Sequence, residues 1–316
     1  MRLKPLAWIV ALACVGPMSA AQPDRISAEI ARLSSDAPKV IAEDSRGAIL
    51  SRLERARTAL ASGDTYLALY DLQTVFEAEG GYRVAATAKS VPDHAAFTRT
   101  WTEFGAPAVT GGAKKDVPVF VEALAQSAEG RAPATYRASL PYAEDAGLMA
   151  GLYYLGESHA MVKFAALCRS LEMKPVGRRL TLSSIEPALR TYENAVVKAY
   201  DAAAAASRPQ YAGVNVAIKL ARTLNEQGHH EGALLQYLVS RYRYRLIEAS
   251  DSPVVGIEAV KVRVKNTRLP AGTDHSIAEF FLQLASAGLN ATEATGAGAS
   301  AILDDILPAY LAVVTR

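Results

Sequence analysis

The residues best suited to chemistry in this 316-residue chain are tyrosines and arginines in the run Tyr-Leu-Val-Ser-Arg-Tyr-Arg-Tyr-Arg, which starts at Tyr237. If this run is helical, Tyr237, Arg241 and Tyr244 share one face, because they lie four and three residues apart. Aromatic faces and guanidinium groups together suit an acidic peptide, a sugar phosphate or a lipid head group. We therefore predict a binding surface at Tyr237, Arg241, Tyr244 and Arg245. The alternative is an ordinary amphipathic helix with snorkelling arginines and with tyrosines packed at its rim.

The sequence around these residues is locally basic. Between positions 237 and 268 there are four more basic than acidic side chains. The basic residues are Arg241, Arg243, Arg245, Lys261, Arg263, Lys265 and Arg268, and the acidic residues are Glu248, Asp251 and Glu258. This excess of positive charge favours an anionic partner at the surface.

Part of the basic segment is compatible with two structures. Residues 259–265 read Ala-Val-Lys-Val-Arg-Val-Lys, and this alternation would place three cations on one face of a strand. In contrast, Ser252-Pro253 is a good helix start, and apolar residues recur over 257–264 at steps of three and four. We favour a helix over 254–265 and keep an edge strand, or a strand that binds a partner, as the alternative.

A second candidate for chemistry is Ser158 in the sequence Gly-Glu-Ser-His-Ala, which resembles the G-x-S-x-G elbow of serine hydrolases. The elbow requires a strand, a strained turn that exposes the serine, and a helix, all within a parallel sheet. The sequence predicts no such sheet. We therefore expect a serine inside a helix, and we keep as an alternative function an envelope serine hydrolase that uses Ser158 with His159 or His275.

The other polar clusters do not have the spacing of known metal or phosphate sites. His229-His230-Glu231 follows a predicted turn, where adjacent side chains point apart, and it is expected to be a solvated turn. Asp274-His275-Ser276 is expected to cap a helix start. Two glycines and two lysines at 111–115 lack the second glycine-lysine-serine element of a phosphate-binding loop. We predict no cofactor and no metal site.

The first 21 residues have the pattern of an export signal. Two basic residues precede an apolar run from Leu6 to Val15, and small residues lead up to Ala21. The run is too short for a mature membrane-spanning helix, which needs roughly 20 apolar residues. We predict cleavage after Ala21 and a periplasmic or secreted protein. In the alternative, Cys14 is part of a lipobox, and its lipid would attach the protein to a membrane.

Removal of residues 1–21 changes both the charge and the cysteine content. The segment holds two of the 34 basic residues and none of the 32 acidic ones, so the mature chain has no net charge. A neutral chain is not typical of a nucleic-acid-binding protein. Cys168 is then the remaining cysteine, and it lies in an apolar helical pattern that predicts a buried side chain.

Apolar residues recur at intervals of three and four almost throughout the chain, which predicts an all-α fold. The helices are expected near 24–34, 38–62, 65–79, 93–105, 116–128, 133–141, 144–173, 183–206, 209–227, 230–249, 274–287 and 298–314. A linker at 110–115 divides N-terminal helical hairpins over 22–110 from a main helical domain over 116–316. A single continuous domain is the alternative.

Two segments of this pattern are similar to each other around a turn glycine. Gly63 and Gly228 each have an alanine seven residues before them and another five residues after them. Glycine allows the chain to reverse, and alanine allows two helices to approach closely. The arrangement resembles the tetratricopeptide repeat, although Arg52 and Arg55 occupy positions that are apolar in that family. The resemblance implies antiparallel hairpins stacked as an irregular α-solenoid or bundle.

Together these features predict an exported, non-catalytic scaffold that binds a protein or peptide of the cell envelope. Stacked helical hairpins form extended surfaces that are commonly used for recognition. A helical bundle that encloses a small ligand or lipid is a further alternative to the serine hydrolase.

Overall fold

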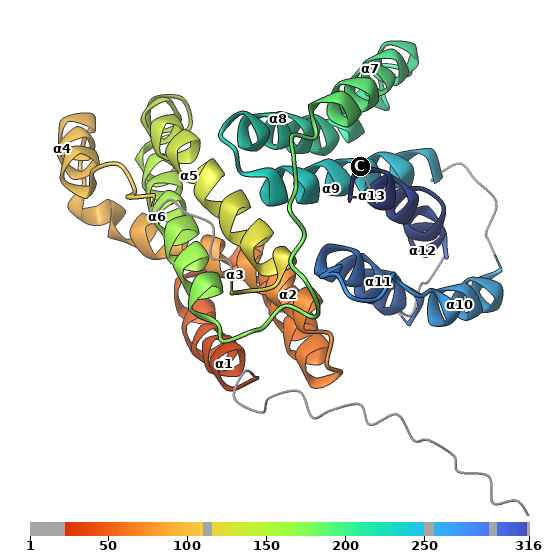
Figure 1. Ribbon diagram of the computed structural model, residues 1–316. Coiled ribbons are helices and arrows are strands. Elements are labelled where there is room, and N and C mark those ends of the chain that lie inside the picture. The colour runs from red at the N-terminus through yellow and green to blue at the C-terminus, as the bar shows by residue number, and fades with distance from the viewer. Residues whose placement is uncertain (1–22, 110–115, 250–255, 291–295, 315–316) are drawn as a thin grey trace, which may run out of the picture.

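The computed structural model describes residues 23–109, 116–249, 256–290 and 296–314. Within these ranges the chain forms helices and no β-strand, so the predicted all-α fold is confirmed (Figure 1). The predicted export signal, Cys14 and the linker at 110–115 lie outside the described residues.

The helices follow one another along the described chain, with longer connections before α5 and α7. They are α1 (Pro23–Val40), α2 (Glu43–Ala61), α3 (Thr65–Ala85), η1 (Ala86–Ser90), α4 (His94–Phe104), α5 (Val119–Asp145), α6 (Leu148–Ser170), α7 (Glu186–Ala202), η2 (Arg208–Tyr211), α8 (Ala212–Glu226), α9 (His230–Ala249), α10 (Ile257–Asn266), α11 (Ser276–Leu289), α12 (Ala297–Ala301), η3 (Ile302–Ile306) and α13 (Leu307–Val314).

Two antiparallel hairpins form where the turn glycines predict them. Gly63 joins α2 to α3 with a φ of 83°, and Gly228 joins α8 to α9 with a φ of 76°. These left-handed conformations favour glycine because it has no Cβ. The backbone hydrogen bonds also correspond: the N–H of Asp64 and the N–H of His229 each donate over 2.8 Å to the carbonyl five residues earlier. The two hairpins therefore share one turn geometry.

The arginines that depart from the tetratricopeptide pattern have a structural reason. Asp71 on α3 is fully buried against α2. The Nε of Arg55 donates to this carboxylate over 3.1 Å, and Arg52 contacts it over 3.4 Å. A buried carboxylate requires hydrogen-bonded partners. The two arginines on α2 therefore stabilise a charge at the hairpin interface.

Two predicted helix boundaries are wrong because burial outweighs the local effect of proline. Pro38 does not start a helix but lies inside the last turn of α1, whose buried stripe continues to Ala37. The predicted helices 116–128 and 133–141 are one helix, α5, with Pro133 in its interior. Proline removes one backbone donor and favours a break. The long contact of α5 with α6 keeps the helix continuous.

The predicted last helix is interrupted at its centre. Residues Ile302–Ile306 form a π-helical turn between α12 and α13. Pro308 follows and cannot donate to the carbonyl of Asp304 four residues earlier, and such a loss is a recognised cause of local helix distortion.

The segment whose sequence is compatible with a helix or a strand is helical. Helix α10 spans Ile257–Asn266, which confirms the helix that we favoured.

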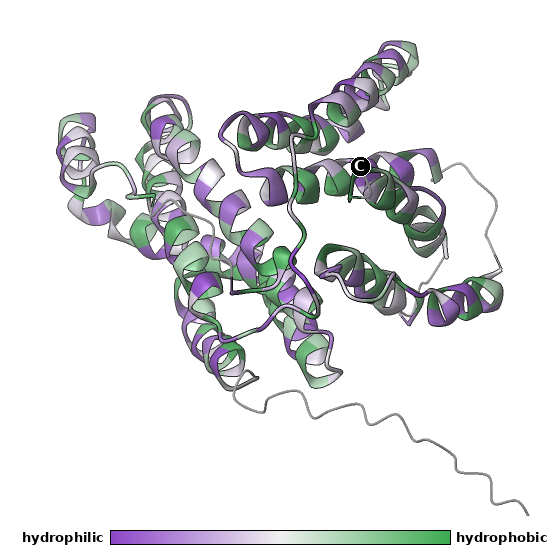
Figure 2. Cartoon of the chain, viewed as in Figure 1, coloured by the Kyte–Doolittle hydropathy of each residue, from purple (hydrophilic) through white to green (hydrophobic). Residues whose placement is uncertain are grey.

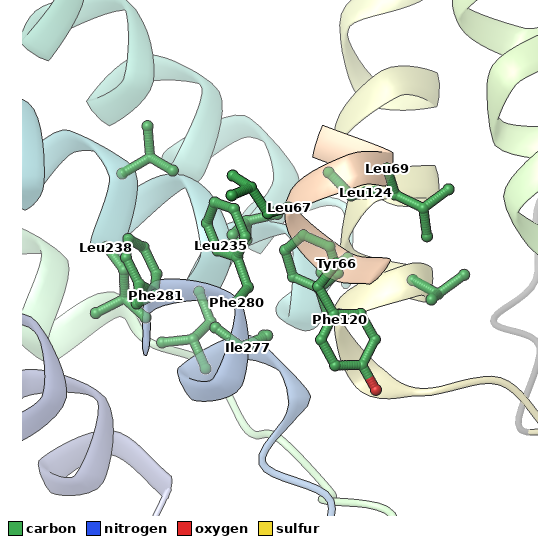
Figure 3. Close-up of a cluster of buried hydrophobic side chains, with 14 of the residues drawn as sticks. Tyr66, Leu67, Leu69, Phe120, Leu124, Leu235, Leu238, Ile277, Phe280 and Phe281 are labelled. Carbon is green, nitrogen blue, oxygen red and sulfur yellow. The ribbon is translucent and has the colours of Figure 1, made fainter. Parts of the chain in front are cut away.

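Helix α11 packs in the hydrophobic core of the molecule. Its Phe280 lies between α3, α5 and α9, and its ring stacks on Phe120 with centroids 4.6 Å apart (Figure 3). The ring centroid of Tyr70 on α3 lies 4.9 Å from that of Phe280. Most residues of α11 and α12 are hydrophobic (Figure 2). One hydrophobic cluster thus joins helices on both sides of the segment 110–115, while α4 packs on a smaller cluster around Phe97.

Polar side chains of α11 and of the loop before it accept hydrogen bonds from backbone amides in the first turns of α3, α5 and α11. Asp274 is buried and accepts hydrogen bonds from the N–H of Val119 over 2.8 Å and from that of Ser276 over 2.9 Å. Gln283 accepts one from the N–H of Leu67 at the start of α3 over 3.0 Å. The first amide groups of a helix have no partner within the helix. These bonds therefore fix the positions of α3 and α5 relative to α11.

Among the described residues, Ala297–Val314 is the one stretch that is long and apolar enough to cross a membrane, judged by length and composition. In this structure Ile302, Ile306 and Tyr310 from that stretch are buried in the hydrophobic core.

Candidate functional site

The four residues predicted to bind a ligand line one groove. The groove lies between α7 and α13, its floor is α9, and its volume is about 520 Å³. We call it the α7–α13 groove. It is lined by Pro187, Ala188, Thr191, Tyr192, Ala195, Tyr237, Arg241, Tyr244, Arg245, Asp304, Asp305, Pro308, Ala309, Ala312 and Val313. Its size lies within the range of about 300–1,000 Å³ that is usual for ligand sites.

Arg241 is the central side chain of the groove floor. Its guanidinium lies 5.1 Å from the ring centroid of Tyr192 and 5.6 Å from that of Tyr237. It also donates to Asp305 over 2.9 Å through Nε and to the hydroxyl of Tyr237 over 3.0 Å. Arg241 therefore contacts two tyrosine rings that also line the groove. Arg241 is held in place by α7, α9 and the π-helical turn at once.

Asp305 is the partner that neutralises the predicted basic surface. Besides Arg241, it pairs with Arg245 over 3.1 Å, and Arg245 also pairs with Glu248 over 2.6 Å. Burial would raise the pKa of Asp305, but the hydrogen bonds from the two arginines outweigh burial and hold its pKa below the ordinary value. The carboxylate is therefore charged at neutral pH and compensates part of the arginine charge.

The local charge estimated from the sequence must be corrected for this acidic pair. Asp304 pairs with Arg263 on α10, so both aspartates of the π-helical turn contact basic residues of the segment predicted to favour an anionic partner. The two acidic residues lie about 60 positions away from α9 in sequence, outside the segment in which charges were compared. The signal that could have identified them is an Asp-Asp pair within an otherwise apolar final helix.

The tyrosines are less exposed than the predicted binding surface implies. Tyr237 on the floor has 4 % of its surface exposed and Tyr192 on the α7 wall has 6 %, so both are packed against neighbouring side chains. Exposed walls are instead made by small residues such as Ala195 on α7 and Ala312 on α13. A ligand in the groove would therefore meet alanine side chains first and the arginine cluster at the floor.

Ser158 lies in a position that does not suit a nucleophile. It is fully buried in the middle of α6, and its hydroxyl donates to the carbonyl of Leu155 over 2.7 Å. His159 contacts the carbonyl of Gly105 over 3.2 Å. His275 belongs to the start of α11, where its Nδ1 lies 2.8 Å from the hydroxyl of Tyr310. The described structure thus shows neither the exposed turn nor the serine–histidine contact that the elbow requires.

A buried acid next to Ser158 was not identified from the sequence. Burial raises the pKa of Glu157 to about 7, with a further contribution from the like charge of Glu77, while Arg131 and a hydrogen bond from Tyr153 act in the opposite direction. Arg131 pairs with Glu77 over 2.5 Å. Arg131 on α5 thus pairs with Glu77 on α3, and its charge also acts on Glu157 of α6. Glu157 does not line the α7–α13 groove.

The remaining sequence candidates have structural partners. Cys168 is fully buried, as its apolar pattern predicts, and burial raises the pKa of its thiol. Glu231 accepts from Arg179 over 3.0 Å and from Gln126 over 2.9 Å. Among the residues that the structure describes, no three histidine, cysteine, aspartate or glutamate side chains are grouped as a metal site would require.

Neither a family model, nor a curated protein, nor a solved structure matches this chain. The function must therefore be argued from the groove and its residues.

Proposed function

We propose that this protein is exported and binds a peptide segment of another cell-envelope protein in the α7–α13 groove, without catalysing a reaction. The observation that carries the proposal is the convergence of Tyr237, Arg241, Tyr244 and Arg245 on one groove of ligand-binding size. Arginine and tyrosine are enriched among the residues that contribute most to protein interfaces. Export is supported by the signal-like pattern of residues 1–21.

The chemistry of the groove favours a ligand with apolar side chains and few charges. At the floor, Asp305 pairs with Arg241 and Arg245, and Glu248 also pairs with Arg245, so an additional charge placed there would not find an uncompensated partner. The walls are formed by small apolar residues, including Ala188, Ala195 and Ala309. Small side chains on two helices allow a third segment of backbone to approach closely. Hydrophobic contact with the walls then supplies most of the affinity.

The first prediction concerns a substitution that fills the groove. Ala195 is exposed on the wall formed by α7, so Ala195→Trp places an indole in the groove without disturbing the core. Peptides would be selected on the wild-type protein from a random library displayed on phage, synthesised, and measured by fluorescence anisotropy. We expect Ala195→Trp to weaken their binding at least about tenfold, which corresponds to the loss of roughly 1.4 kcal/mol of binding free energy.

Ala134→Trp is the matched control because Ala134 is exposed on α5 and lines none of the grooves. This variant should bind the selected peptides with the affinity of the wild type. Equal binding by the wild type and Ala195→Trp would contradict the assignment of the groove. A library that yields no binding peptide would contradict the proposed function itself.

A further inference from the structure

The similarity between the two hairpins extends to a third helix in each case. Helices α2 and α3 span residues 43–61 and 65–85, and η2 with α8 spans 208–226 while α9 spans 230–249. A constant offset of 165 residues therefore relates both helices of the hairpins. Each hairpin is preceded by one more helix, α1 in the first case and α7 in the second. We call α1–α3 the first unit and α7–α9 the second unit.

The first helices of the two hairpins are buried at equivalent positions. In the first unit the buried positions on α2 include Leu53 and Ala56, and in the second unit the corresponding positions are Ile218 and Ala221. At the offset of 165 residues, Leu69 and Leu72 of α3 correspond to the buried Leu234 and Tyr237 of α9, so the two second helices have equivalent faces, including the one that carries Tyr237, Arg241 and Tyr244. On α9 this face is the floor of the α7–α13 groove.

The corresponding face of α3 is also the floor of a groove. This second groove lies between α1 and α6 and has a volume of about 610 Å³, and we call it the α1–α6 groove. Three of its floor residues, Phe76, Glu79 and Gly80, correspond at the offset of 165 residues to Arg241, Tyr244 and Arg245 in the α7–α13 groove. Helix α6 forms a wall of this groove, as α13 does in the α7–α13 groove.

Part of the charge in the α1–α6 groove is neutralised by ion pairs within and between α1 and α3. Arg32 pairs with Glu29 over 2.5 Å and lies 5.6 Å from the ring centroid of Phe76. Arg83 pairs with Asp36 over 3.2 Å and with Glu79. As in the second unit, an arginine lies over an aromatic ring and carboxylates compensate the arginine charge.

Two further cations of the α1–α6 groove have no such compensation. Lys163 on α6 and Arg25 on α1 both line the groove and are exposed. Arg25 donates to the carbonyl of Ser170 over 3.0 Å, and neither cation forms an ion pair with a side chain in the part of the chain that the structure describes. Phe76 and Phe104 provide apolar surface in the same groove.

We propose that the α1–α6 groove is a second binding site and that it takes an acidic segment with apolar side chains. The proposal rests on the proposed peptide-binding function for the class of ligand, and on Lys163 and Arg25 for its charge. Carboxylates of the ligand pair with these two cations, and its apolar residues contact Phe76 and Phe104. The two grooves differ in the ligand charge that they favour, since the cations of the α7–α13 groove are already paired.

The test uses a fluorescein-labelled amphipathic peptide of glutamate, leucine and alanine, together with the same peptide in which lysine replaces glutamate. We expect the acidic peptide to bind the mature protein and the lysine peptide to bind at least about tenfold more weakly. Replacing both cations, as Arg25→Gln with Lys163→Gln, should weaken the acidic peptide about fivefold or more, as expected for the loss of two exposed ion pairs. Added salt should weaken it in the wild type.

The control variant is Lys219→Gln, which removes an exposed cation on α8 that lines neither groove. Ala166→Trp, at an exposed position of α6 within the α1–α6 groove, should block the acidic peptide, and Ala195→Trp should not. If Ala195→Trp blocks it and Ala166→Trp does not, the second site is wrong while the proposed function stands. Equal affinity for both peptides, or no effect of the double glutamine variant, would also overturn the second site.

Discussion

At the scale of single residues, the structure separates side chains that stabilise the fold from those that face a groove. Ser158 and Cys168 are both fully buried on α6 and have surroundings that explain them without a reaction. Glu157 is different because its pKa of about 7 lies well above the ordinary value for glutamate. This shift makes the stability of the protein depend on pH.

The sign of this dependence follows from the raised pKa of Glu157. The folded protein binds a proton at Glu157 that the unfolded chain releases above about pH 4.5, so the stabilisation is complete below that pH and is lost as the pH rises through about 7. The free energy of unfolding contributed by this group should fall by roughly 2–3 kcal/mol between pH 4.5 and pH 8. Urea unfolding at a series of pH values measures it.

Glu157→Gln should remove most of this pH dependence, because glutamine is neutral throughout the range. At pH 8 the variant should be more stable than the wild type, while at pH 4.5 the two should be similar. Glu144→Gln changes an exposed glutamate on α5 and serves as the control. A wild-type protein whose stability rises from pH 4.5 to pH 8 relative to Glu157→Gln would show that the carboxyl group is not held neutral by its surroundings.

At the scale of the helices, close contact between α3 and α6 positions one wall of the α1–α6 groove. A Cβ added at Gly156 would lie 2.5 Å from the carbonyl oxygen of Gly80, which is shorter than real contacts allow. The two helices would have to separate. In contrast, an added Cβ at Gly47 on α2 would have no atom within 4 Å.

This difference gives a prediction about two identical substitutions. Gly156→Ala should lower the free energy of unfolding by about 1–3 kcal/mol, because overpacking of an interface forces the backbone to shift. Gly47→Ala should raise it by up to about 1 kcal/mol, because alanine favours a helix more than glycine does. Chemical denaturation of both variants measures the difference. Equal effects of the two substitutions would mean that α3 and α6 are not in close contact.

The helices also show how far local sequence patterns determine this fold. The two turn glycines predict both hairpins, and the apolar stripe at 257–264 predicts α10. Prolines were the main source of error, since Pro133 lies inside α5 and Pro38 inside α1. Proline changes a local preference by a few kcal/mol, whereas a continuous buried face along a neighbouring helix can outweigh it. Such contacts join segments that are distant in sequence, so a local sequence pattern does not predict them.

At the scale of the whole molecule, the candidate site was predictable only in part. The spacing of Tyr237, Arg241 and Tyr244 placed them on one face, and the structure brings all of them to one groove. Asp305 and the wall formed by α7 could not be predicted, because tertiary packing brings them there, that of the C-terminal helices on α9 and that of α7 on α8. The same packing reduces the positive charge that the sequence suggested. We therefore propose that the peptide binds in a groove between helices and not on a basic surface.

The most direct test of this account is site-specific photocrosslinking. A benzophenone amino acid would be introduced at position 195 in the α7–α13 groove, or at position 134 on α5 as the reference, and irradiated with a library-selected peptide. The account predicts a covalent adduct with the peptide at position 195 and none at position 134. Equal adduct formation at both positions, or an adduct at position 134 alone, would contradict the claim that this groove binds the peptide.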